Sequence, residues 1–153
     1  MYTFIILCLI LLIKSNNLDY IPQDAINYAK TYCKNYNPNY KTYDLDEYEE
    51  ANFVSQCLFA GGQSFSGCKT KDEHGVIFKY NDLQDCLKSK GWVDTRTRDS
   101  RFKLGYPIFK ASERYPLLAV GLKGNKILYA AHRIDQCEKE IDDDDLIFYY
   151  PKE

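Results

Sequence analysis

The stretch Asp46–Gly62, DEYEEANFVSQCLFAGG, has the pattern of a helix whose N-terminal end could carry a nucleophile. The partial positive charge of a helix N-terminus lowers the pKa of a thiol, and a nearby imidazole completes its activation for attack on an amide carbonyl. At this position the chain has Glu49 and Glu50 instead of a cysteine. Any chemistry at this end of the helix therefore depends on two carboxyl groups.

Two carboxylates can hydrolyse a glycoside when they are held on opposite sides of the bond to be cleaved. Glu49 and Glu50 are adjacent, so on a helix their side chains diverge by about 100°, which disfavours this chemistry and leaves only a distant partner such as Asp135. A simpler interpretation is a capping box, with Asp46 as N-cap and Glu49 three residues later. Acidic residues in the first turn also gain about 0.3–1 kcal/mol from the helix macrodipole.

Three other side chains could act as nucleophile or base. Cys57 follows Glu50 by two helical turns, about 10 Å along the helix, so we expect a buried structural thiol. His74 precedes Gly75 in a polar loop and is expected at the surface. His132 could stack or hydrogen-bond within a groove, but a satisfied structural histidine is the favoured interpretation.

No pattern in the sequence indicates a metal ion or another cofactor. The chain has no CxxC or HxxxH spacing, which excludes the common zinc motifs. The acidic run Asp142–Asp145 lacks the spaced D-x-D-x-D-G pattern of a calcium loop, so we expect a solvated loop.

The N-terminus predicts a secreted protein. Tyr2–Ile13 is an apolar run of twelve residues, shorter than the about 20 residues that a membrane-spanning helix needs. It fits the hydrophobic part of a signal peptide covering residues 1–15, with Ser15 as a small residue for cleavage. An uncleaved anchor is the alternative. After cleavage, a single domain at 16–153 would lie outside the cell or in the secretory lumen, without membrane attachment.

An oxidising compartment favours disulfide bonds. The mature chain would keep five cysteines, which permit at most two bridges with one thiol left over. Cys68 and Cys86 flank a loop before a helix and are expected to staple it. Cys33 and Cys137 are the other candidates, and Cys57 is the expected free thiol.

Composition indicates one globular domain. The chain has 153 residues, is 45% hydrophobic and carries a formal net charge of −2. A core of ordinary size is therefore expected, and the absence of a basic stripe argues against a nucleic-acid partner. The fourteen tyrosines are consistent either with half-buried side chains or with a sugar- or peptide-binding face.

Hydrophobic periodicity predicts an α+β fold in which N-terminal helices pack on an antiparallel sheet. Helices are expected at 21–33, at 46–60 before Gly61-Gly62, and at 81–90 with Asn81 as N-cap. Strands are expected at 106–110, 115–123, 126–132 and 146–151. The two middle strands are joined by a two-residue turn at Gly124-Asn125.

Three segments of the chain, AINYAKTYCKNYNPNY, ANFVSQCLFAGG and YPLLAVGLKGNKILYAAHRID, together resemble the putative amidase domain family. That family is similar to the NlpC-type cell-wall hydrolases, which have a papain-like fold. The resemblance covers roughly residues 22–148, and its most specific element is N-F-V-S-Q-x-L-x-A-G-G.

The resemblance implies a Cys-His hydrolase, but this chain departs from the motif. The family's Asp-Cys pair becomes Glu49-Glu50, so Glu50 occupies the nucleophile position. The expected base falls on Tyr115, or on Pro116 if the register shifts by one residue. His132 and Asp135 match a later His-x-x-Asp element. The retained side chains that would bind a ligand are Asn52, Gln56 and His132.

These departures favour a secreted protein that has lost catalysis and kept a binding groove. Its partner would be a cell-wall peptide, a glycan or an extracellular protein. One alternative is an active amide- or peptide-bond hydrolase with an unidentified nucleophile. Another is a purely structural secreted domain held together by disulfides.

Overall fold

Helices come first in the chain and strands follow. The computed structural model describes residues 20–132 and 136–152. The helices are α2 (Pro22–Tyr32), α3 (Asp46–Ala60) and α4 (Tyr80–Ser89). The strands are β1 (Trp92–Thr95), β2 (Pro107–Lys110), β3 (Tyr115–Lys123), β4 (Lys126–Ala131), β5 (Gln136–Ile141) and β6 (Leu146–Pro151). This order confirms the predicted α+β class.

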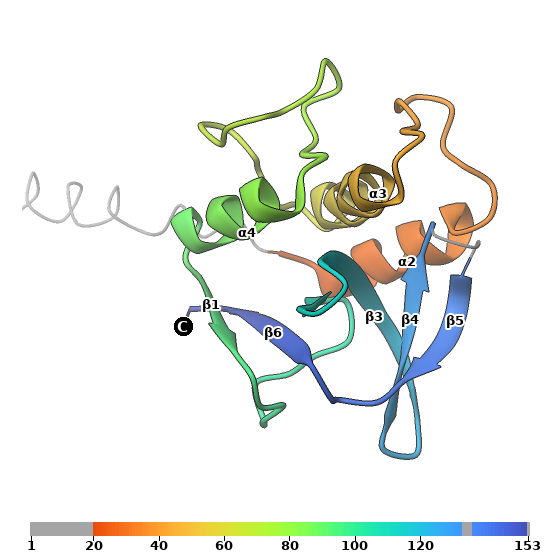
Figure 1. Ribbon diagram of the computed structural model, residues 1–153, viewed down its shortest axis with the longest axis vertical. Helices are drawn as coiled ribbons and strands as arrows, with labels where there is room; N and C mark the ends of the chain where they lie inside the picture. The colour runs from red at the N-terminus through yellow and green to blue at the C-terminus, as the bar shows by residue number, and fades with distance from the viewer. Residues whose placement is uncertain (1–19, 133–135, 153) are drawn as a thin grey trace, which may run out of the picture.

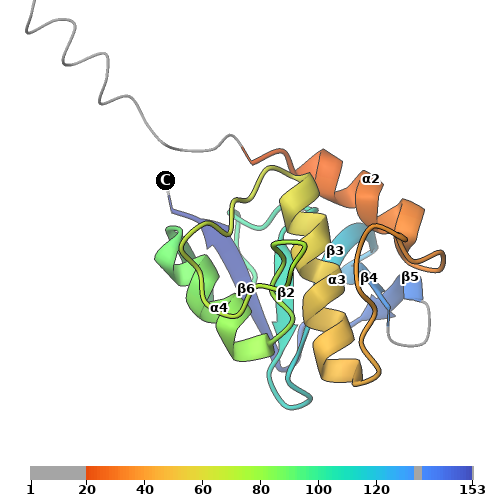
Figure 2. The same cartoon turned by 90° about the horizontal axis from the view of Figure 1, so that it is seen from above.

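The strands form one antiparallel sheet in the order β1-β6-β2-β3-β4-β5. All three helices lie on one face of it, with α3 between α2 and α4 (Figures 1 and 2). The centre of α3 is completely buried at Phe53, Val54 and Leu58. Each such side chain contributes about 1.5–3 kcal/mol when it leaves water. The helix–sheet interface is therefore the main core of the protein.

The register of the sheet decides which side chains face the helices. Phe109 of β2 contacts Tyr80 of α4, with ring centroids 5.4 Å apart, so Phe109 points to the helical side. Its neighbour Lys110 points to the opposite side, and Lys110 is paired directly with Tyr115 of β3. Directly paired side chains share a face. Tyr115 therefore points away from the helices, while Pro116, paired with Phe109, points toward them.

Most of the predicted boundaries agree with the structure, and the hairpin at Gly124-Asn125 joins β3 to β4 as expected. The sequence did not predict β1 and β5, the two edge strands. An edge strand has a hydrogen-bonding partner on one side only and carries charged residues, which hides the alternation that marks a strand. β5 reads QCEKEI, and its middle residues are exposed.

Two predicted helix caps are wrong. Helix α3 begins at Asp46, but its N-cap is Leu45 and no side chain caps it. The carboxyl group of Glu49 instead accepts a hydrogen bond from the backbone N–H of Tyr43, outside the helix. The N-cap of α4 is Lys79 rather than Asn81, whose Oδ1 accepts a hydrogen bond from Arg114 at 3.2 Å.

Two disulfide bonds join distant parts of the fold. Cys33 at the end of α2 is bonded to Cys137 of β5, and Cys68 is bonded to Cys86 of α4. Cys57 is a free, buried thiol. The predicted cysteine roles are confirmed for these residues. The predicted signal peptide and Asp135 lie outside the described residues.

We predict that the two disulfides contribute unequally to stability. The sequence separation is 104 residues for Cys33–Cys137 and 18 for Cys68–Cys86. From loop-closure entropy, the double variant C33S/C137S should lower the free energy of unfolding by about 4–5 kcal/mol, and C68S/C86S by about 3 kcal/mol. Urea denaturation of both variants checks the order, and an equal or reversed loss would contradict it.

Candidate functional site

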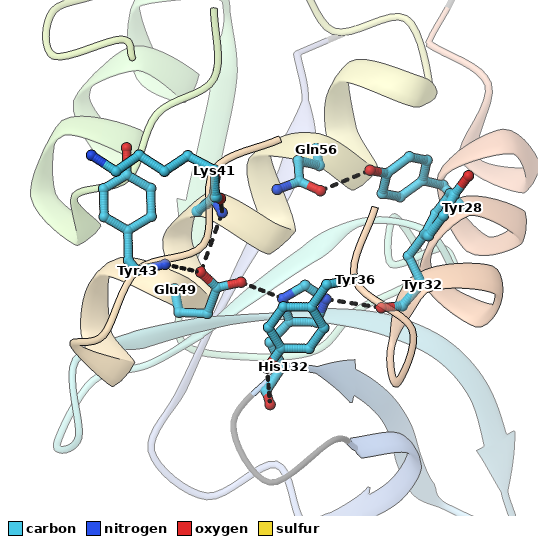
Figure 3. A network of polar contacts seen from close by, with 9 residues as sticks. Tyr28, Tyr32, Tyr36, Lys41, Tyr43, Glu49, Gln56 and His132 are labelled. Carbon is cyan, nitrogen blue, oxygen red and sulfur yellow. Dashed lines mark hydrogen bonds and ion pairs between the residues drawn. The ribbon is translucent and has the colours of Figure 1, made fainter. Parts of the chain in front are cut away.

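A buried carboxyl–imidazole pair lies at the N-terminal end of α3. Oε1 of Glu49 is hydrogen-bonded to Nδ1 of His132, which directly follows β4 (Figure 3). The other ring nitrogen, Nε2, lies 2.9 Å from the backbone oxygen of Tyr32. A carbonyl oxygen can only accept, so Nε2 carries a proton and donates it there. Both nitrogens of the ring are therefore engaged within the protein.

The two faces of the imidazole are also covered. The ring of Tyr36 stacks on one face, with centroids 3.8 Å apart and planes 3° from parallel. The ring of Phe53 stacks on His132 at 3.9 Å and 24°. Only 3% of His132 is exposed to solvent. The side chain is thus enclosed in the plane of its ring and on its faces.

The cover is supplied by the segment Lys34–Leu45, here called the strap, which connects α2 to α3. The hydroxyl of Tyr36 donates a hydrogen bond to the backbone oxygen of His132 at 3.3 Å. The backbone N–H of Tyr43 donates to Oε2 of Glu49 at 2.7 Å. The backbone oxygen of Lys41 accepts from Nδ2 of Asn52 at 2.8 Å. Three points of the strap are therefore fixed to α3 and to His132 (Figure 3).

The N-F-V-S-Q motif explains how α3 holds these segments. Asn52 binds the strap, Phe53 stacks on His132, and Ser55 Oγ donates to the backbone oxygen of Ile77 at 2.7 Å. The amide oxygen of Gln56 accepts from the hydroxyl of Tyr28 at 2.7 Å. Each of these side chains links α3 to a different part of the chain. The motif is an architectural one in this protein.

The glycine pair that ends the motif has a steric role. A Cβ atom on Gly61 would lie 2.5 Å from Cε2 of Tyr20 and 3.2 Å from the backbone oxygen of Ile21. Gly62 has a φ of 94°, a left-handed conformation that favours glycine. The pair lets the segment before α2 pass directly across the end of α3.

The predicted catalytic positions do not come together as a nucleophile and a base. Glu50, at the nucleophile position, is completely buried. Tyr115 points to the face of the sheet opposite α3, as the register shows. Burial, and next the negative charge of Glu50, raise the pKa of the Cys57 thiol well above its usual value. A reactive thiolate at Cys57 is therefore scarce at neutral pH.

The predicted binding residues are also turned inward. Asn52 and Gln56 are buried, and their amide groups bind Lys41 and Tyr28. His132 binds Glu49 and the backbone of Tyr32. Nδ2 of Asn52, Oε1 of Gln56 and both ring nitrogens of His132 therefore bind groups of the protein itself, whereas Oδ1 of Asn52 is buried without a hydrogen-bond partner among the described residues.

Members of the acidic run near the C-terminus bind basic side chains and backbone groups. Asp143 lies 2.8 Å from Arg98, and Oδ2 of Asp145 accepts from the backbone N–H of Ser112 at 2.7 Å. Hydrogen bonding from Ser112, with the charge of Arg96 as a smaller cause, lowers the pKa of the Asp145 carboxyl. These contacts join the turn between β5 and β6 to the segments that follow β1 and β2.

The structure defines an α+β domain with a closed carboxyl–imidazole pair at the start of its central helix. In comparison with known proteins, the family described as Putative amidase domain matches residues 19–105. This is more than half of the chain, which therefore belongs to that family. No curated protein matches the chain, and no solved structure does. The papain-like and NlpC-like assignment stays a prediction.

The family match covers only some of the residues of the candidate site. Residues 19–105 include Glu49, Glu50 and the complete N-F-V-S-Q motif, but end before Tyr115 and His132. Sequence reasoning missed Glu49 as the partner of His132. One signal was available: in the predicted correspondence with the family motif, Glu49 falls on a position where another acid is expected.

We predict that His132→Ala strongly destabilises the fold. Removing one member of a buried pair leaves the other without its partner and costs about 3–5 kcal/mol. The matched control is His74→Ala, since the chain has two histidines and His74 lies in the exposed loop. That control should change the free energy of unfolding by less than about 0.5 kcal/mol. Urea denaturation measures both, and similar small losses would contradict a structural role for His132.

Proposed function

We propose that this protein is a catalytically inactive member of its family that acts as a binding domain. The observation that carries the proposal is the engagement of His132 by Glu49, the Tyr32 carbonyl oxygen and two aromatic rings. A Cys-His hydrolase needs an imidazole nitrogen that can take a proton from a thiol within hydrogen-bonding reach. The ring of His132 has no such nitrogen available.

The residues that could act as a nucleophile also support the proposed loss of catalysis. Glu50 has a carboxyl group where the family motif has a thiol, and it lies in the interior. Cys57 is buried two turns along the helix, with a raised thiol pKa. Among the described residues the other cysteines are in disulfides, so their sulfurs do not titrate. The arrangement keeps the scaffold of a hydrolase and lacks its reacting atoms.

We further propose that the protein is secreted, with residues 1–15 as a cleaved signal peptide, residues 16–153 as one domain and a papain-like topology. Two disulfide bonds fit an oxidising compartment. In the part of the chain that the structure describes, no helix has the length and hydrophobicity to span a membrane. The partner would then be an extracellular peptide, glycan or protein.

An amide-hydrolysis assay tests the loss of catalysis. The full chain is incubated with soluble muropeptides, and release of primary amines is followed with fluorescamine. We expect no release above the buffer rate, before or after treatment with iodoacetamide. Native Cys57 should also stay unlabelled by iodoacetamide, as read by peptide mass spectrometry, and become labelled in guanidinium. Amine release that iodoacetamide abolishes would contradict the proposal.

A further inference from the structure

The strap that covers His132 contributes no fully buried apolar side chain to the core. Among its residues, only Asn37 is buried. The strap is held to α3 and His132 by hydrogen bonds and by the stacked ring of Tyr36. The net contribution of a single hydrogen bond is small, because water offers competing partners. Segments with few buried apolar contacts open at a small part of the global free energy of unfolding. We therefore expect closure of the strap to depend on a contact outside it.

The Cys33–Cys137 disulfide lies at the start of the strap and supplies such a contact. Cys33 directly precedes the strap and follows Tyr32, whose backbone oxygen is 2.9 Å from Nε2 of His132. Cys137 is the second residue of β5, and this strand pairs with β4 as far as Ala131, the residue before His132. The disulfide therefore joins the two segments that meet at the imidazole.

A second contact between α2 and β5 is weaker than the disulfide. Nζ of Lys30 lies 2.8 Å from Oε1 of Glu138, and about half of each side chain is exposed. Exposed ion pairs stabilise a fold little, because water and salt screen their charges. This ion pair cannot replace the covalent bond between the same two elements.

We propose that the Cys33–Cys137 disulfide is a redox-sensitive latch that keeps the site closed. In the oxidised protein the strap lies across His132. Reduction releases the start of the strap and exposes the imidazole to solvent, while the helices and the sheet stay folded. The inference goes beyond the proposed function, because it concerns when the closed site opens. The opened site still has Glu50 at the nucleophile position.

The reductant is a small dithiol, and the exchange is balanced between the two molecules. One thiolate of the dithiol attacks Sγ of Cys137, which is half-buried and lines a shallow hollow beside Lys34. Cys33, at 2% exposure, leaves as a thiolate. The second thiolate of the reductant attacks the reductant's own sulfur in the mixed disulfide and releases Cys137. The dithiol gives up two electrons and becomes a disulfide, and its two protons end on the two cysteines.

Two double variants test the latch. C33S/C137S, the latch variant, removes the disulfide next to the strap, and C68S/C86S, the control variant, removes the other one. In each bridge one cysteine is buried and the other half-buried, so the two changes are matched in chemistry and burial. The control bridge joins the loop after α3 to α4, which lies on the opposite side of α3 from α2 (Figure 2).

Acylation by diethyl pyrocarbonate reports whether the imidazole is covered. In the latch variant, His132 should react within about fivefold of the rate of the exposed His74, because the strap no longer covers the ring. In the control variant, His132 should react at least about tenfold more slowly than His74, as in the wild type. Protection of His132 in both variants, or exposure in both, would overturn the proposal.

Hydrogen exchange shows whether the opening is local. In the latch variant, the amide of Tyr43, which donates to Glu49 in the closed site, should exchange within about tenfold of the rate of an unfolded chain. Amides of α4 and β6 should stay protected at least about a hundredfold. Loss of protection in all of these elements would show unfolding of the domain and overturn a local latch. Protection of Tyr43 equal to that of α4 would overturn it as well.

Reduction of the control variant tests the switch itself, because among the described residues its remaining bridge is Cys33–Cys137. Dithiothreitol, removed under nitrogen before labelling, should bring His132 to the reactivity it has in the latch variant. Reoxidation with oxidised glutathione should restore its protection. The proposal is overturned if the bridge resists dithiothreitol in the folded protein, as read by peptide mass spectrometry. It is also overturned if His132 stays covered after reduction or stays exposed after reoxidation.

Failure of the latch and failure of the proposed function are distinguishable. The hydrolysis assay uses the oxidised chain, and amide cleavage there would contradict the loss of catalysis without changing the comparison of the two variants. A His132 that stays covered without the disulfide would remove the latch and leave the inactive site as it is.

Discussion

Glu49 holds the start of α3, the strap and His132 together through one buried carboxyl group. Its Oε2 accepts from the backbone of Tyr43 and lies 3.4 Å from the amide of Asn52, and its Oε1 binds His132. A carboxyl group at 6% exposure is costly to bury unless hydrogen bonds replace its water. The three partners come from the strap, from α3 and from the end of β4. The cost of separating them keeps the three segments in one arrangement.

The rest of the structure supports this contact from both sides. Cys33–Cys137 fixes the end of α2, just before the strap, to β5, which follows His132 in the sheet. On the helix, the N-F-V-S-Q motif keeps Phe53 under the imidazole and Asn52 against the strap. The space around the imidazole is thereby filled by protein side chains. The residues of the N-F-V-S-Q motif build a closed core around His132.

The sequence predicted the parts of this arrangement that depend on local pattern. The bounds of α3, the glycine exit, the central hairpin, the cysteine roles and a structural His132 all follow from periodicity or from chemistry within short segments. The contact between His132 and Glu49 could not be predicted from the sequence, because the two residues are 83 positions apart. Acidic residues at the start of a helix also have an ordinary local explanation as caps. The edge strands β1 and β5 were also not predicted. Each is hydrogen-bonded to a neighbour on one side only and carries charged residues, so the alternation of apolar and polar residues that marks a strand is weak in their sequences. The orientation of Tyr115 depends on strand register, which places this side chain on the face of the sheet opposite α3.

The most direct measurement for the closed site is the reactivity of its imidazole toward diethyl pyrocarbonate, which acylates accessible histidine nitrogens. The two histidines provide an internal comparison, because His74 lies in an exposed loop and His132 is enclosed. Peptide mass spectrometry of the native protein should find His74 modified and His132 unmodified until the chain is unfolded. Modification of native His132 at a rate comparable to that of His74 would show an available base and contradict both the closed site and the proposed loss of catalysis.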